Sequence, residues 1–237
     1  MSQDNQKLRE QHSLMEGQRS SSYAIFADAP EYWFSYDAYL ELFKQYAQRK
    51  EMVNILNVGA ATGILEFLAL REVPNLHFVS VDNSRDFTDR FQKKNKEAIE
   101  AGKVEHVLSS IQDFETDLRF DIIVSRDFNH HIEMDVVEQY IKHCYGMLNE
   151  GGSFIIEDLK REAEEVGIND LVKVVYSIPA FQTDDYNRYH KIMGIIDSYF
   201  VAYHTDEIKA LLDGLGLPYE LQNEKYRYKF IVKNEHN

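Results

Sequence analysis

The sequence is poor in the residues that hold small secreted domains together and in those that form flexible linkers. Its 237 residues include one cysteine, Cys144, which excludes an internal disulfide and a zinc site built on paired cysteines. Only 4 prolines and 11 glycines are present, so long flexible linkers are not expected. We therefore expect a chain that folds by burying apolar side chains, and the lone cysteine fits a reducing compartment.

Long apolar runs and an excess of positive charge are also missing. No stretch approaches the ~20 apolar residues of a membrane span, and the polar start, Met1 to Gln11, lacks the apolar centre of a signal peptide. The chain carries 26 Lys and Arg against 40 Asp and Glu, a net charge of −14. Such a surface repels nucleic-acid phosphates and anionic lipid headgroups. We therefore expect a cytoplasmic monomer or homodimer with no nucleic-acid and no membrane partner.

From residue 53 onward, short apolar runs alternate with stretches of helical periodicity. The apolar runs predict strands at Val53–Val58, His77–Asp82, Val104–Leu108, Phe120–Ser125 and Ser153–Glu157. The stretches between them predict helices at Gly63–Arg71, Arg85–Ala101 and Val136–Leu148. Strands that alternate with helices indicate an α/β fold, in which a parallel sheet is covered by helices on both faces.

The two ends of the chain follow a different pattern. Residues 1–50 are expected to form an N-terminal arm and cap helices, with a helix at about Tyr32–Arg49. Residues 51–237 form the main domain, in which two apolar stripes predict a helical insertion at 160–200. Thr205 is expected to cap a further helix. A closing hairpin of Tyr219–Gln222 and Tyr226–Val232 follows.

The stretch Ile55-Leu-Asn-Val-Gly-Ala-Ala-Thr-Gly-Ile64 carries the clearest chemical signal. A strand runs into Gly59 and a helix starts near Gly63, so the turn places free N–H groups and the positive end of a helix beside a ligand. The next strand ends at Asp82, where a carboxylate can accept both hydroxyl hydrogens of a ribose. This pair predicts a nucleoside site, and the alternative is a tight turn without a ligand.

The spacing of the glycines distinguishes between nucleotide-binding families. It reads G-x-A-x-G, which does not fit the G-x-G-x-x-G of a pyrophosphate-binding loop. It resembles motif I, [D/E]-x-G-x-G-x-G, of the class I S-adenosylmethionine-dependent methyltransferases. Four later segments resemble further motifs of that family in the same order: Val79–Asp82, Phe120–Ser125, Leu148–Ile156 and Tyr203–Leu217. The resemblance covers Val53 to Val232. It implies a seven-stranded Rossmann-like sheet of order 3-2-1-4-5-7-6, with the last hairpin strand antiparallel.

The resemblance also implies a cofactor, S-adenosyl-L-methionine (SAM), with S-adenosyl-L-homocysteine (SAH) as its product. The residues that it places at the cofactor are Asn57, Gly59, Ala60, Ala61, Gly63, Asp82, Asn83, Ser110, Ile111, Gln112, Ser125, Arg126 and Asp127. Three of them depart from the family pattern: Asn57 and Ser110 stand where acids are usual, and Ala61 replaces a glycine. Gln112 or Asp113 is the expected substitute for the acid missing at Ser110. These changes leave open an enzyme that modifies SAM itself, or a non-catalytic binding or partner subunit.

The loop Ser125-Arg-Asp-Phe-Asn-His-His-Ile132 follows the fourth predicted strand, at the edge where such folds bind ligands. Methyl transfer needs a general base only when the nucleophile arrives protonated. His130 and His131 are the candidates, and Asp158 is another, just past the fifth strand. The alternatives are loop hydrogen bonding for the histidines, and a helix cap or a solvated turn for Asp158. Two adjacent histidines without a third ligand do not predict a metal site.

The resemblance implies that the helical insertion at 160–200 forms a lid over the acceptor pocket. Aromatic residues before the first strand and in this lid are candidates for that pocket, with plain packing as the alternative. They are Tyr23, Phe26, Tyr32, Tyr186 and Tyr189. Together with the acidic surface, they favour a small acceptor. The sequence therefore predicts methyl transfer from SAM to an oxygen or nitrogen of a small organic molecule.

Overall fold

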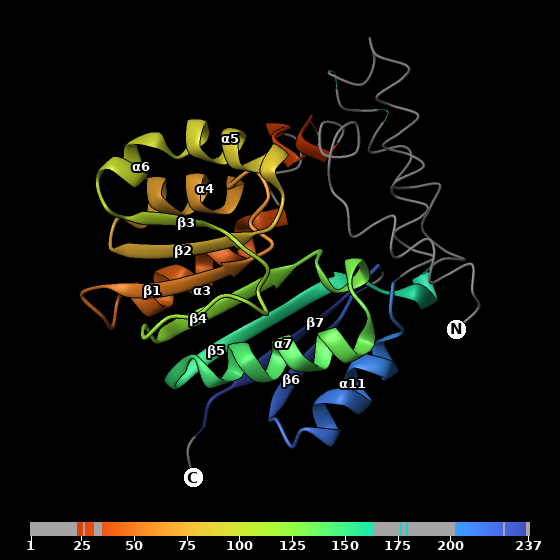
Figure 1. The fold of residues 1–237 in the computed structure, drawn as a ribbon. Coiled ribbons are helices and arrows are strands. Elements are labelled where there is room, and N and C mark those ends of the chain that lie inside the picture. Colours follow the sequence, from red (N-terminus) through yellow and green to blue (C-terminus); the bar gives the residue numbers. More distant parts are fainter. Residues whose placement is uncertain are drawn as a thin grey trace.

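The computed structural model describes residues 23–25, 27–30, 35–163, 176, 179, 202–224 and 226–235 (Figure 1). The predictions for Phe26, Tyr32, Tyr186 and Tyr189 lie outside the described residues, as does nearly all of the lid expected at 160–200. Within the described part, no helix is long and apolar enough to cross a membrane.

Seven strands form one mixed sheet in the order β3-β2-β1-β4-β5-β7-β6. Neighbours among β1 to β5 pair in parallel, whereas β7 runs antiparallel to both β5 and β6. The order and the antiparallel last strand predicted from the sequence are therefore confirmed. The strands are β1 (Val53–Val58), β2 (Leu76–Asp82), β3 (Val104–Leu108), β4 (Phe120–Arg126), β5 (Leu148–Leu159), β6 (Tyr219–Asn223) and β7 (Arg227–Lys233).

Helices cover both faces of the sheet (Figure 1). The apolar side chains of β1 alternate between two cores: Val53 and Ile55 pack with residues of α3 and α4, and Leu56 and Val58 pack with residues of α7 and α11. This alternation decides which side chains meet at the ends of the strands. The helices are α3 (Asp37–Ala47), α4 (Ile64–Glu72), α5 (Arg85–Lys94), α6 (Lys96–Glu100), α7 (Met134–Gly146) and α11 (Thr205–Gly214), with short 3-10 turns η2 (Asn129–His131) and η3 (Arg161–Ala163).

The helix predicted over Arg85–Ala101 is in fact two helices, α5 and α6, separated by Asn95. The backbone of Asn95 leaves helical geometry, with φ −101° and ψ 16°. Its buried side-chain amide donates hydrogen bonds to the carbonyl oxygens of Gly63, at 3.0 Å, and Phe91, at 3.4 Å. The break thus ties the end of α5 to the glycine loop, and helical periodicity does not register such a long-range contact.

Two smaller predictions are also corrected. Strand β5 begins at Leu148 rather than at the predicted Ser153, so Gly151 lies inside the strand. The residue before α11 is His204, whose backbone N–H donates to the Glu207 carboxylate at 2.9 Å. Thr205, the predicted cap, is the first residue of the helix, and its hydroxyl donates to Glu162.

Candidate functional site

A pocket opens where the carboxyl ends of β1, β2 and β4 meet, which is the edge where open α/β sheets bind ligands. We call it the first pocket. Its wall consists of Tyr23, Val58, Gly59, Ala61, Val81, Asp82, Asn83, Phe87, Ser109, Ser110, Ile111, Gln112, Arg126, Asp127, Phe128, His131 and Ile132. A second pocket shares five of these residues and adds Ala27, Tyr36, Asn57, Ala60, Thr62, Ile64, Leu65 and Val124. The shared wall makes the two pockets parts of one site.

Most of the predicted cofactor residues line one pocket or the other, and two of them do not. Gly63 lies behind the loop against α5, and Ser125 turns its hydroxyl toward Tyr140 of α7, at 3.5 Å. Asp113, considered as a substitute for the acid missing at Ser110, is absent from both walls and instead accepts a hydrogen bond from the Ser110 hydroxyl at 2.6 Å. Of the two predicted substitutes, Gln112 is therefore the one that reaches the first pocket.

Three residues of the glycine loop have positive φ angles, and only two of the three are glycines. Gly59 and Gly63 both have φ of +71°, and a side-chain carbon at Gly59 would lie 2.9 Å from the Phe128 ring. Glycine is thus required at position 59 by its backbone angle and by the neighbouring ring. Ala61 also adopts a positive φ, +47°, which costs an L-residue about 1–2 kcal/mol. The loop therefore keeps its shape with alanine at this position, at some cost in stability.

Asp82 lines the first pocket at the end of β2 and also holds the glycine loop in place. One carboxylate oxygen accepts the backbone N–H of Ala61 and the other accepts that of Ser84, both at 2.8 Å. Burial raises the pKa of the Asp82 carboxyl, and these two hydrogen bonds oppose the rise. Each oxygen has a second lone pair that can accept from a ligand hydroxyl. The sequence indicated the ligand role of Asp82 but not its role in joining two loops.

The second pocket ends at a buried group of charges on the α3 face of the sheet. The Arg126 guanidinium lies 4.4 Å from the centre of the Tyr36 ring and 3.3 Å from the Glu157 carboxylate. Glu157 also accepts from Arg227 and from Lys229, each at 2.9 Å. Burial acts to raise the pKa of Glu157, but the nearby cations outweigh it, and this pKa lies below its ordinary range.

The same group includes a second carboxylate and its cationic partner. Asp127, with φ of +54°, forms an ion pair with Arg227. Burial also acts to raise the pKa of Asp127, and the positive charges of Arg227 and Arg126 hold it below its usual value. Among the described residues, this group contains the anions Asp127 and Glu157 and the cations Arg126, Arg227 and Lys229. Arg126 belongs to the wall of both pockets, so a cationic side chain is available there to an anionic ligand group.

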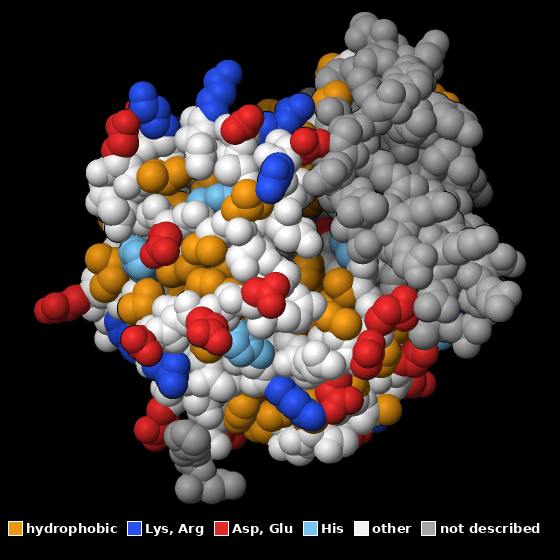
Figure 2. Space-filling model, viewed as in Figure 1, with side chains coloured by type: hydrophobic (Ala, Val, Ile, Leu, Met, Phe, Trp, Pro, Cys, Tyr) orange, Lys and Arg blue, Asp and Glu red, His pale blue; other side chains and the backbone are white. Residues whose placement is uncertain are grey.

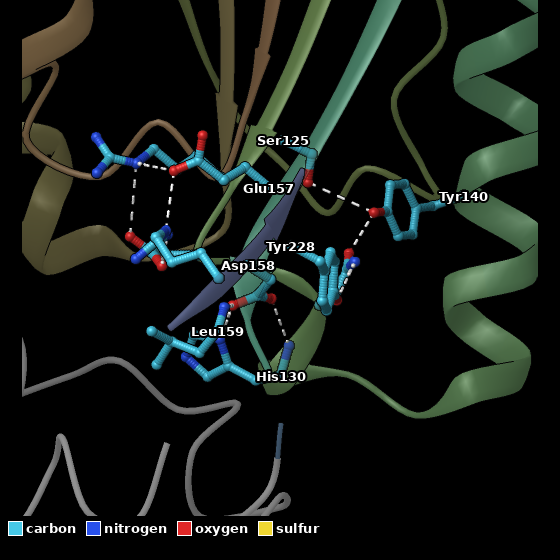
Figure 3. Close-up of polar contacts among 11 residues, drawn as sticks. Ser125, His130, Tyr140, Glu157, Asp158, Leu159 and Tyr228 are labelled. Carbon is cyan, nitrogen blue, oxygen red and sulfur yellow. Dashed lines mark hydrogen bonds and ion pairs between the residues drawn. The ribbon is translucent and has the colours of Figure 1, made fainter. Parts of the chain in front are cut away.

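His130 and Asp158 form a buried pair at the ends of β4 and β5, where Figure 3 shows their side chains turned toward each other. His130 Nδ1 lies 2.7 Å from one Asp158 oxygen, and the His130 backbone N–H donates to the other at 3.0 Å. Both side chains are at most 5% exposed. Because a carboxylate can only accept, Nδ1 carries the proton and Nε2 is the basic nitrogen. Asp158 is thus neither a helix cap nor a solvated residue.

The two histidines hold different positions. His131 lines the first pocket, and its ring centre lies 4.0 Å from that of His130. The loop is fixed from behind by Asn129, whose amide donates to the Tyr228 hydroxyl at 3.2 Å and accepts from Tyr140. Across the described ranges, no group of three or more His, Cys, Asp or Glu side chains is placed to bind a metal ion.

Some residues of the wall were not identified from the sequence. Tyr23 was predicted, and it packs against Phe87 of α5 with ring centres 5.7 Å apart. Phe87 and Phe128 both line the first pocket, and Tyr36 lines the second. Phe87 also belongs to the apolar periodicity of its helix, so its sequence signal is that of a core residue. Only the placement of α5 beside Tyr23 shows that it faces the pocket.

Comparisons with known proteins bear on the family. Residues 55–152 match the model of a methyltransferase domain. A search of curated protein sequences gave no significant match. Among solved structures, the plantazolicin methyltransferase BpumL in complex with a monoazolic desmethylPZN analog and SAH has a TM-score of 0.75 at 15% identity. That alignment covers 98% of this chain and 97% of the other.

Two further structures show the same fold. An O-methyltransferase family protein from Burkholderia thailandensis has a TM-score of 0.61 at 17% identity, with 89% of this chain and 58% of the other covered. The N-methyltransferase NodS from Bradyrhizobium japonicum WM9 has a TM-score of 0.55 at 15% identity, with 84% and 96% covered. In all, 1132 chains of solved structures match significantly, so the fold alone does not select an acceptor.

Proposed function

We infer the activity of this protein from its family, because the chain carries a methyltransferase domain and has the class I fold of the SAM-dependent enzymes. We propose that it transfers the methyl group of SAM to an oxygen or nitrogen of a small organic acceptor. The observation that carries this proposal is that the glycine loop, the Asp82 carboxylate, Arg126 and His131 line one site, with the buried His130–Asp158 pair in ring contact with His131.

The chemistry of the site supports SAM as the ligand. Asp82 presents two acceptor oxygens to a ribose, and Gly59 keeps the backbone open to close approach. The Arg126 guanidinium in the wall of both pockets fits the carboxylate of an amino-acid end. When bound, SAM supplies a methyl group on a positively charged sulfur. The plantazolicin methyltransferase BpumL was crystallised with SAH, which agrees with this assignment.

The His130–Asp158 pair supports an acceptor that arrives with a proton on its nucleophilic atom. Asp158 fixes the tautomer of His130, so Nε2 can take that proton while the acceptor oxygen or nitrogen bonds to the methyl carbon. The carbon–sulfur bond breaks in the same displacement, and its electron pair stays on the sulfur. The chain contributes mainly alignment and the fixed base.

Acidic side chains (red) are scattered among basic ones (blue) on the face shown in Figure 2. Together with the net charge of −14, this disfavours a polyanionic acceptor. The proposal therefore predicts a small molecule as the methylated product.

Incubation of the protein with methyl-labelled SAM and a cell extract tests the acceptor class. Label is expected in the small-molecule fraction, on a compound that is not formed when the protein is omitted. Label in the nucleic-acid or protein fraction would contradict a small acceptor. SAM that is bound but keeps its label would support a non-catalytic binding subunit, and altered SAM without a methylated product would support an enzyme that modifies SAM itself.

A further inference from the structure

Asn57 and Ser80 lie side by side in the sheet and face the same helix. They are register partners on the parallel strands β1 and β2. Asn57 continues the row of Val53 and Ile55, whose side chains pack toward α3 and α4. Phe78 belongs to the same core, so Ser80, two residues further along β2, points to that face as well. Two polar side chains thus enter an otherwise apolar layer beneath α4.

Glu66 in the first turn of α4 meets both of these side chains. Its Oε1 accepts from the Asn57 amide nitrogen at 2.7 Å and from the Ser80 hydroxyl at 2.5 Å. The Glu66 side chain is fully buried, and its other oxygen, Oε2, has no hydrogen-bond partner in the described part of the chain. Burial raises the pKa of the Glu66 carboxyl, and the hydrogen bonds from Asn57 and Ser80 and the charge of Lys94 oppose the rise. The buried carboxyl of Glu66, which is not part of the pocket wall, thus fixes the orientation of Asn57, which is part of the wall.

The contact with Glu66 decides which end of the Asn57 amide faces the pocket. The oxygen and nitrogen of a carboxamide point in different directions from one carbon. Because the nitrogen is bound to Glu66, the oxygen is the polar atom that remains toward the second pocket, whose wall includes Asn57. Among the described residues, no group donates a hydrogen bond to that oxygen.

We propose that Glu66 is a positioning residue that turns the Asn57 oxygen toward the ammonium group at the amino-acid end of SAM. The inference rests on the proposed use of SAM. The family pattern has an acid at position 57, whereas this loop has an uncharged acceptor there and a carboxyl lies one layer outward, on α4. Asn57 and Glu66 therefore form a pair in which the amide lies at the pocket and the acid lies on α4. The function of each residue depends on the other.

A double-mutant cycle tests the pair without any ligand. N57D alone places two carboxyls in contact within a buried layer, so the folded pair binds a proton more tightly than the unfolded chain does. A carboxyl whose pKa is raised on folding loses stability as the pH rises, so the melting temperature of N57D should fall by ~5 °C or more at pH 8, and by less at pH 5.5. N57D/E66Q should melt within ~2 °C of wild type at both pH values. Additive losses from N57D and E66Q would overturn the pairing.

Ligand selectivity tests the direction of the Asn57 oxygen. In N57D/E66Q a charged oxygen replaces the amide oxygen, so the affinity for SAH should rise by about three- to tenfold. Affinity for 5′-methylthioadenosine, which lacks the ammonium and carboxylate groups, should stay within about twofold and is the matched control. Unchanged SAH affinity in a folded double variant would overturn the proposal. If wild-type protein does not bind SAH at all, the proposed function fails instead, and the melting cycle still decides the pairing.

Discussion

Replacement of His130 by alanine is expected to slow methyl transfer by about 100- to 10,000-fold, because a positioned general base contributes that much to a proton-transfer step. Asp158→Asn should cause a loss of similar size. The amide can donate to Nδ1, and this would move the ring proton to Nε2 and remove the basic nitrogen. Turnover of the identified acceptor and SAH affinity should be measured on the same preparations.

The affinity for SAH should stay within about threefold in both variants, because neither residue belongs to the wall of the first or the second pocket. His77→Gln is a suitable control, since His77 lies near the opposite end of β2. This exchange should leave both the turnover of the acceptor and the affinity for SAH unchanged. Turnover of His130→Ala within threefold of wild type would show that the pair has a structural role only.

Gly63→Ala is expected to destabilise the protein by about 2–4 kcal/mol, through overpacking and a strained backbone together. The φ of +71° disfavours any side chain, and the added carbon would lie 2.3 Å from the Asn95 amide nitrogen and 2.6 Å from the Phe91 ring. For a chain of this length the melting temperature should fall by about 5–15 °C. Thermal unfolding followed by circular dichroism measures the shift.

Ala61→Gly in the same loop is the matched control. The φ of +47° favours glycine, so this exchange should leave stability unchanged or raise it by up to ~1 kcal/mol. Equal losses of stability in the two variants would show that the backbone angle does not decide which residues the loop accepts.

The sequence predicted those features that depend on neighbours in the chain. The apolar runs gave the bounds of β1 and β3 as the structure has them. The glycine loop and Asp82 were predicted to meet because the carboxyl ends of adjacent parallel strands lie at one edge. The same reasoning selected the histidine loop and Asp158, although it did not show that the two touch.

Features that depend on distant partners could not be predicted. Asp127 is paired by Arg227, which is 100 residues away, and no local pattern connects them. Glu66 occurs in an ordinary helical stretch, and only the register of β1 with β2 shows that it meets Asn57 and Ser80. The loss of the acid at position 57 was apparent from the sequence. The carboxyl that lies behind it became apparent only after the helix was placed on the sheet.

Titration calorimetry with SAH, on wild-type protein and Asp82→Ala in parallel, tests the central claim most directly. We expect SAH to bind the wild type and NAD to show no binding, because the loop spacing does not fit a pyrophosphate. Asp82→Ala should weaken SAH by at least ~10-fold, since the carboxylate makes charge-assisted hydrogen bonds of ~1.5–3 kcal/mol each. Tight binding of NAD without SAH, or unchanged SAH affinity in a folded Asp82→Ala, would contradict this account of the site.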